Sequence, residues 1–150
     1  KLSKVGDEHK FNFPLPKVEG GNISYSGTKT AFINFLHNNT NKNKNFIDEN
    51  LHDICASIQK NLIDNLLIKV KFLATKNNLN SIIFGGGVSA NSYPKRRLDN
   101  ESKENNWKVF IPELQYSTDN AAMIGIVGYL KYSISELSDL KSTPLPRYSL

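Results

Sequence analysis

Cysteine is nearly absent from this sequence: Cys55 is the single one among 150 residues. One cysteine excludes an internal disulfide and any metal site built from several cysteines. Because Cys55 falls on the apolar face of an expected helix, we interpret it as a small buried thiol.

Long hydrophobic runs are also missing. The longest, near Ala121 to Leu130, contains glycines and is too short to span a bilayer. The first residues are polar and charged, without the apolar stretch of a signal peptide. These absences predict a soluble protein that needs no membrane, located in the cytoplasm or, as the alternative, in an organelle.

The excess of positive charge is modest, because nineteen Lys and Arg residues face fourteen Asp and Glu residues and leave a net charge of +5. Such a balance suits an anionic partner such as RNA, but the charge is scattered along the chain. Lys95-Arg96-Arg97 is the one basic triplet. Two interpretations of it stay open: a grip on nucleic-acid phosphate, or a solvated helix face.

Three consecutive glycines, Gly85, Gly86 and Gly87, follow the run Ser81–Phe84, which is typical of a buried strand. Glycines at the carboxyl end of a strand let the backbone turn sharply and let a ligand reach bare amides. A helix expected to start near Asn91 would aim its free N–H groups at the same place. The pattern predicts a phosphate-sized or nucleotide-sized site, although it matches neither the P-loop nor the dinucleotide fingerprint. A tight turn without a ligand is the equal alternative.

The first half of the chain predicts mostly helix. Residues 1–23 are irregular, and Ile23–Tyr25 predicts a short strand before a helix that begins at Ser26. The Asn- and Lys-rich residues 38–45 predict a mobile loop. Apolar residues at steps of three and four from Leu51 to Leu73 then predict the longest helix.

The second half alternates helices and strands. Residues 91–104 predict a polar helix, 107–111 a strand, and 121–130 a helix that Thr118-Asp119-Asn120 would cap; residues 138–150 predict an extended tail. This order indicates an α/β fold with helices packed on a partly parallel sheet. Ligands bind such sheets at the carboxyl ends of the strands, so Gly85–Asn91 and Ser117–Asn120 could form one site.

Four segments carry a family resemblance. They are Gly-Gly-Val-Ser-Ala-Asn at 86–91, Ser-Thr-Asp-Asn-Ala-Ala-Met-Ile-Gly at 117–125, Ser-Gly-Thr-Lys-Thr at 26–30 and Phe-Pro-Leu-Pro at 13–16. In this order they resemble the TsaD family, formerly called O-sialoglycoprotein endopeptidase or glycoprotease. Thr28 stands where that family usually has Leu.

The resemblance implies one lobe of an actin-like ATPase fold of two lobes. The family transfers a threonylcarbamoyl group from threonylcarbamoyl-adenylate to N6 of the adenosine beside the anticodon of tRNA. The implied partners are tRNA and the other proteins of the threonylcarbamoylation complex. The implied ligands are one divalent metal, iron or zinc, and threonylcarbamoyl-adenylate or ATP.

Site residues carry over from the family at two positions. The resemblance implies that Asp119 is a metal ligand and that Asn91 contacts the nucleotide, with Gly85, Gly86 and Gly87 as the turn beside it. A carboxylate suits a hard or borderline cation, and an amide can both donate and accept hydrogen bonds. The alternative for Asp119 and Asn91 is that each merely caps a helix.

The family's His-x-x-x-His metal motif is not found among His9, His37 and His52. We therefore expect residues 1–150 to be the C-terminal lobe of a longer protein: a truncated chain, a proteolytic remnant or half of a split protein. Alone it should be inactive, with no catalytic residue of its own. The alternatives are a non-catalytic nucleotide-binding or interaction lobe and, last, a metalloprotease, although no His-Glu-x-x-His occurs.

Overall fold

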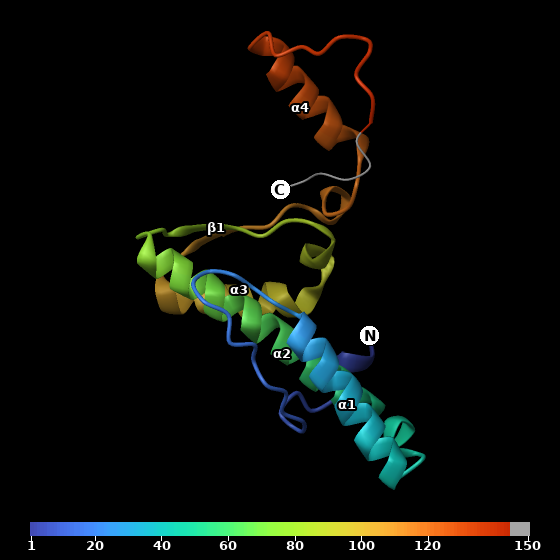
Figure 1. Cartoon of the computed structure of the whole chain (residues 1–150). Coiled ribbons are helices and arrows are strands. Elements are labelled where there is room, and N and C mark those ends of the chain that lie inside the picture. The colour runs from blue at the N-terminus through green and yellow to red at the C-terminus, as the bar shows by residue number, and fades with distance from the viewer. Residues whose placement is uncertain (145–150) are drawn as a thin grey trace. The chain divides into compact units, whose positions relative to one another are not determined.

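The computed structural model describes residues 1–144, which form four helices, two strands and three short 3₁₀ turns (Figure 1). The elements follow in the order 3₁₀ turn Leu2–Lys4, α1 (Ser26–Lys42), α2 (Phe46–Lys76), β1 (Ser81–Ile83), 3₁₀ turn Gly87–Ala90, α3 (Ser92–Asn105), β2 (Lys108–Phe110), 3₁₀ turn Leu114–Tyr116 and α4 (Ala121–Ser133). The chain divides into two compact units. The first unit contains residues 1–82 and 96–109, and the second contains residues 83–95 and the chain from Phe110 onward.

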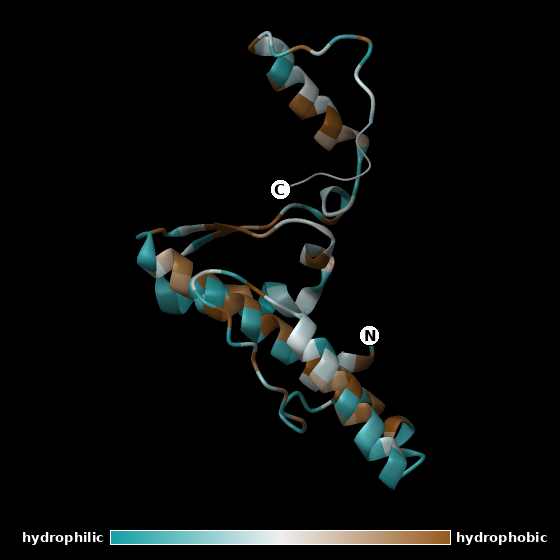
Figure 2. Ribbon diagram, in the orientation of Figure 1, coloured by the Kyte–Doolittle hydropathy of each residue, from teal (hydrophilic) through white to brown (hydrophobic). Residues whose placement is uncertain are grey.

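The first unit is built on α2, which is longer than the apolar periodicity predicts. It begins at Phe46, and Figure 2 shows hydrophobic and hydrophilic residues interspersed along its ribbon. Ile54, Ile63 and Leu67 are all at most 7% exposed. Cys55 is only half-buried, so the prediction of a buried thiol is wrong. Its neighbours in the sequence, Ile54 and Ala56, take the buried positions instead.

Every fourth residue on another side of α2 is polar, and each of these residues bonds to the preceding chain. Asp53 Oδ1 accepts from the backbone N–H of Asp7 at 2.8 Å. Further along the helix, Asn61 Nδ2 donates to the carbonyl of Phe13 at 2.7 Å. The complete set, which we call the polar ladder, is Asp53, Ser57, Asn61, Asn65 and Lys69. The irregular segment of residues 7–24 is thereby fastened to α2 through its own backbone.

The polar ladder also explains why Ile23–Tyr25 is not a strand, contrary to the sequence-based prediction. The carbonyl oxygen of Ser24 accepts from Asn65 Nδ2 at 3.1 Å, so a side chain supplies the hydrogen-bond donor that a neighbouring strand would otherwise supply. At the start of the chain, Gly6 passes close to α2: a Cβ there would lie 2.1 Å from the carbonyl oxygen of His52. Only glycine allows that approach.

A cluster of aromatic side chains forms another part of the core of the first unit. Phe35 contacts Phe11, Phe13 and Phe46, and Phe11 also contacts Phe46, with ring centroids 5.1 to 5.8 Å apart. Phe35 lies on α1, which packs against α2, and α1 runs through residues 38–42, where the composition predicts a loop. The prediction is wrong for residues 38–42, where asparagines bond within the helix, as Asn39 Nδ2 does to the carbonyl of Phe35 at 2.8 Å. Residues 43–45 do form the connection between the two helices, as predicted.

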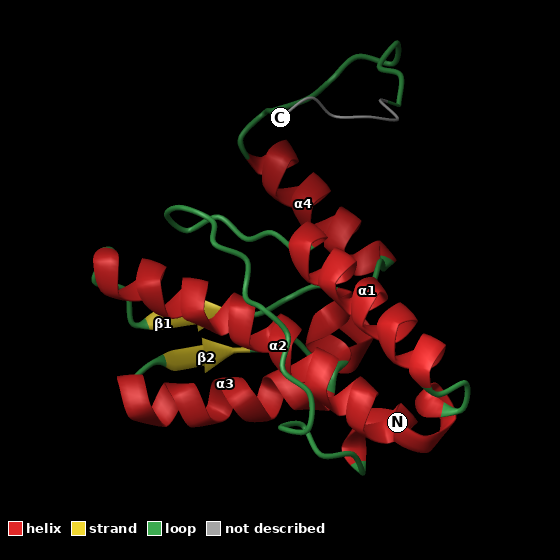
Figure 3. Cartoon of the chain, turned by 60° about the horizontal axis from the view of Figure 1, so that its bottom comes forward, coloured by secondary structure: helices red, strands yellow, loops and turns green. Residues whose placement is uncertain are grey.

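The strands β1 and β2 pair as a small parallel sheet, side by side in Figure 3. The prediction that β1 is buried is wrong, because Ile83 is 81% exposed and Phe110 on β2 is 55% exposed. A parallel sheet buries its strands only where helices cover both faces. In residues 1–144 the sheet consists of two strands of three residues each, a surface too small for helices to cover on both faces.

The polar helix α3 is found where the sequence predicts it, and two ion pairs join it to α2 within the first unit. Arg97 Nη2 lies 2.7 Å from Asp64 Oδ1, and Lys71 Nζ lies 3.0 Å from Glu101 Oε2. Leu98 is 2% exposed. After α4, residues 138–144 contain no helix or strand, and a turn at Leu140 and Lys141 interrupts the extended tail that the sequence predicts; residues 145–150 of that tail lie outside the described range.

A candidate nucleotide cleft in the second unit

The glycine turn of the second unit needs glycine at Gly86, whose φ of +84° is a backbone conformation that other residues rarely adopt. A Cβ at Gly85 or Gly87 would meet no atom within 4 Å, so open space lies in front of both. The turn leads into the 3₁₀ turn Gly87–Ala90 and not directly into an α-helix. The helix expected near Asn91 begins at Ser92, after this 3₁₀ turn.

The second motif, residues 117–120, leads into α4. Asn120 is the N-cap of this helix, since its backbone is extended and its Oδ1 accepts from the N–H of Met123 at 3.0 Å. The interpretation of Asp119 as the capping side chain is wrong for that reason. A capping oxygen must stand two or three residues before the N–H that it accepts, and Asn120 holds that place. Asp119 is exposed.

The two motifs meet at a cleft of about 320 Å³ that lies wholly within the second unit. Its walls are Gly86, Gly87, Tyr116, Ser117, Thr118, Asp119 and Met123. Backbone amides of a glycine turn and a carboxylate therefore border one opening. An anionic group could lie against the amides, and a cation could lie beside Asp119.

Two of the candidate residues do not line this cleft. Gly85 is not among its walls, and neither is Asn91. The Oδ1 atom of Asn91 accepts from the N–H of Tyr93 at 3.0 Å, so this side chain caps the start of α3. The capping interpretation thus holds for Asn91, whose amide nitrogen is the group available to a ligand.

A metal site is not complete in the described part of the chain. Among residues 1–144, no group of three His, Cys, Asp or Glu side chains lies close enough to hold a metal. Asp119 supplies one carboxylate at the cleft. The residues present thus fit a metal as one ligand of a set and not as a whole site.

The basic triplet is partly engaged inside the first unit. Arg97 pairs with Asp64 at 2.7 Å, and Arg96 Nη2 lies 3.9 Å from Glu8 Oε2. The side chain of Arg97 is 25% exposed, whereas that of Arg96 is 67% exposed. These pairs favour a structural role for Arg97 over a grip on nucleic-acid phosphate.

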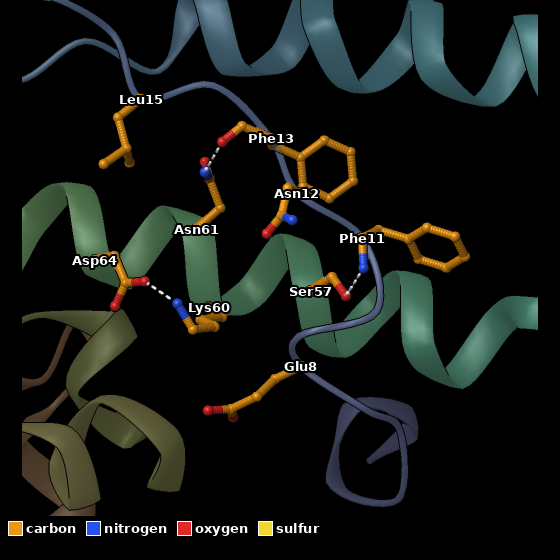
Figure 4. Close-up of a pocket in the computed structure, with 9 residues that line it drawn as sticks. All are labelled: Glu8, Phe11, Asn12, Phe13, Leu15, Ser57, Lys60, Asn61 and Asp64. Atoms are coloured by element: carbon orange, nitrogen blue, oxygen red, sulfur yellow. Dashed lines mark hydrogen bonds and ion pairs between the residues drawn. The ribbon is translucent and has the colours of Figure 1, made fainter.

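A second cavity, of about 200 Å³, lies in the first unit between α2 and the segment that contains Phe-Pro-Leu-Pro (Figure 4). Ser57 and Asn61 of the polar ladder line it, and the Lys60–Asp64 ion pair crosses its edge. Hydropathy reasoning missed this feature. The one signal in the sequence is the recurrence of polar residues at every fourth position along one side of α2, from Asp53 to Lys69.

Comparison with known proteins agrees with the motifs. The family model for tRNA N6-adenosine threonylcarbamoyltransferase, TsaD, matches residues 1–126. Among curated proteins of that name, the one from Christiangramia forsetii is 43% identical over 148 residues, 99% of this chain and 44% of the relative. The one from Riemerella anatipestifer is 40% identical over 150 residues, 100% of this chain and 44% of the relative. This chain thus spans less than half the length of these two relatives.

The fold class also agrees with the resemblance, because the chain combines helices with a small parallel sheet and the family has an actin-like ATPase fold. None of the helices in residues 1–144 is both long enough and apolar enough to cross a membrane. The family that the four motifs indicate is confirmed by a match over most of the chain. This chain belongs to the TsaD family of tRNA N6-adenosine threonylcarbamoyltransferases.

Proposed function

We propose that this chain is the C-terminal lobe of a tRNA N6-adenosine threonylcarbamoyltransferase and that it contributes one wall of the active site. The observation that carries the proposal is the cleft of the second unit, where the glycine turn and Asp119 border the same opening. The names of the relatives supply the reaction, and the chain's 44% share of their length supports the assignment to part of a larger protein.

The glycine turn is the proposed binding site for the phosphate of the adenylate. Gly86 and Gly87 line the cleft, and no side chain lies within 4 Å of where their Cβ atoms would be, so an anionic oxygen can approach the backbone amides. Threonylcarbamoyl-adenylate and ATP share this phosphate chemistry. Asn91 would donate its amide N–H to the ribose or the carbamoyl group while its Oδ1 keeps the start of α3 in place.

Asp119 is the proposed contribution to the metal centre. Because the described residues offer one carboxylate at the cleft, the remaining ligands would come from outside them. Iron or zinc, when bound, would supply a positive charge for the anionic substrate. The proposed partners are tRNA and the other proteins of the threonylcarbamoylation complex, and the proposed location is the cytoplasm.

A chimera tests this proposal. The chain replaces the segment of the Christiangramia forsetii protein that it matches over 148 residues, and threonylcarbamoyl-adenosine is measured in tRNA after incubation with threonylcarbamoyl-adenylate. We expect the chimera to modify tRNA and the isolated 150-residue chain to leave it unmodified. Asp119→Asn in the chimera should keep the fold, because Asn120 caps α4, but lose bound metal and modification.

Asp99→Asn is the matched control, since Asp99 is an exposed carboxylate on α3 and is not among the residues that line the cleft. It should leave metal content and modification unchanged. Full metal content and activity in the Asp119→Asn chimera would remove Asp119 from the metal site. Modification of tRNA by the isolated chain would show that it is not merely one lobe of the enzyme.

A further inference from the structure

Two serine hydroxyls meet out of contact with solvent in the second unit. Ser89 is 0% exposed and Ser117 is 2% exposed, and their Oγ atoms lie 3.1 Å apart. They come from the two motifs that form the cleft, 28 residues apart in the sequence. Of the two, Ser117 itself lines the cleft.

Each hydroxyl of the Ser89–Ser117 pair also contacts a backbone carbonyl of its own motif. Ser89 Oγ lies 2.7 Å from the carbonyl oxygen of Gly86, and Ser117 Oγ lies 3.3 Å from that of Glu113. A hydroxyl has one proton to donate. The two hydroxyls therefore share two protons among three contacts, one of which joins Ser89 Oγ to Ser117 Oγ.

The pair therefore joins two backbone turns that local bonds alone would leave separate. The N–H of Ser89 donates to the same Gly86 carbonyl at 2.9 Å, and the N–H of Ser117 donates to the carbonyl of Leu114 at 3.1 Å. A buried hydroxyl that loses its partner carries a desolvation cost, so the pair resists separation. Gly86 and Asp119, at opposite ends of this connection, both line the cleft.

We propose that Ser89 and Ser117 are positioning residues, which hold the glycine turn at a fixed distance from the Asp119 loop. For the identity of the ligand, the inference rests on the function proposed above. Both hydroxyls bond within the protein, to each other and to backbone carbonyls. Their role is to hold the two walls of the cleft in place before a ligand binds, so that ligand binding does not carry the cost of ordering them.

Amide hydrogen exchange of the 150-residue chain, followed by NMR, tests the connection without any ligand. Ser117→Ala should speed exchange about five- to ten-fold at the N–H groups of Ser89 and Asn91, which belong to the other motif, because one buried hydrogen bond is lost. Ser89→Ala should do the same at Ser117. Ser117→Thr keeps the hydroxyl and should restore slow exchange in the other motif.

Ser133→Ala is the matched control, because Ser133 Oγ bonds only the Tyr129 carbonyl in α4 and is exposed. It should change exchange at neither motif. A purely local role predicts that each alanine variant speeds exchange in its own motif alone, and that result would overturn the proposal. The double variant should add little to either single one, since both remove the same connection.

Titration with adenosine monophosphate separates this inference from the proposed function. Binding should shift the amide resonances of Gly86 and Gly87 in the unmodified chain, and each serine variant should weaken it about five-fold. Absence of these shifts in the unmodified chain would contradict the proposed phosphate-binding site. The exchange measurement would still test whether the two serines connect the two motifs. Equal affinity in the chain and both variants would overturn the positioning role.

Discussion

The side-chain amide of Asn61 donates a hydrogen bond to the carbonyl oxygen of Phe13, 2.7 Å away and shielded from solvent. The two residues are 48 positions apart, and Phe13 opens the Phe-Pro-Leu-Pro segment. The two prolines of that segment fix its shape but have no backbone N–H of their own to donate. Asn61 therefore makes the tertiary bond that holds this family motif against α2.

Asn61→Ala should lower the free energy of unfolding by about 1–2 kcal/mol, because the buried carbonyl of Phe13 loses its donor. Urea denaturation measures the change. Asn50→Ala is the control, since Asn50 Nδ2 bonds only the Phe46 carbonyl one turn earlier in the same helix. The control should change stability by less than about 0.5 kcal/mol. Equal effects of the two substitutions would show that the long-range bond contributes no more than a local one.

Thr28→Val should raise the free energy of unfolding by about 1 kcal/mol. Thr28 is 1% exposed, and its Oγ1 has no hydrogen-bond partner among the described residues. Valine has nearly the same shape and no hydroxyl to desolvate. Thr30→Val, at an exposed position where Oγ1 bonds the Ser26 carbonyl, is the control in the same thermal melts. A loss of stability at Thr28 would mean that its hydroxyl has a partner such as a buried water.

Asp53 should make the first unit sensitive to acid. The hydrogen bond from the Lys10 ammonium, and then that from the Asp7 N–H, hold the pKa of the Asp53 carboxyl below its ordinary value of 3.8. The unfolded chain therefore binds a proton there before the folded one does. The resulting stabilisation is complete above that ordinary value and is lost as pH falls through the lowered pKa.

Urea midpoints measured from pH 7 to pH 3 check this expectation. Asp53→Asn should flatten the fall in stability at the acid end, and Lys10→Gln should flatten it in part. Asp99→Asn, at the exposed carboxylate on α3, should leave the curve's shape as it is. An unchanged acid limb in Asp53→Asn would assign the acid sensitivity to other carboxyl groups.

Substitutions of Asn91 can separate its cap from its proposed ligand contact. Asn91→Ser keeps an oxygen that can accept from the Tyr93 N–H, whereas Asn91→Ala removes it. We expect Asn91→Ala to lower the free energy of unfolding by about 1 kcal/mol and Asn91→Ser to leave it nearly unchanged. Both should weaken adenosine monophosphate binding about five-fold, measured by calorimetry. If Asn91→Ser binds as well as the unmodified chain, Asn91 is a cap only.

The helices α2, α3 and α4, the strand β2 and the family could all be predicted from the sequence, because each depends on local patterns of residues. Apolar residues at steps of three and four predict a helix wherever it packs. A motif such as Gly-Gly-Val-Ser-Ala-Asn is recognised by its letters alone. The glycine turn belongs to the same class, since only Gly86 needs the left-handed backbone and its neighbours leave open space.

Only the packed chain shows which groups the polar side chains bond to. Asn61 and Ser57 stand at positions that a hydropathy pattern assigns to solvent, and their partners are backbone groups 46 to 50 residues away. Similarly, the order of strands predicts that the two motifs lie at one site, but nothing in their residues indicates that Ser89 and Ser117 bond to each other. A hydrogen bond depends on distance and direction between two groups, and chain segments far apart in sequence acquire these only when they pack.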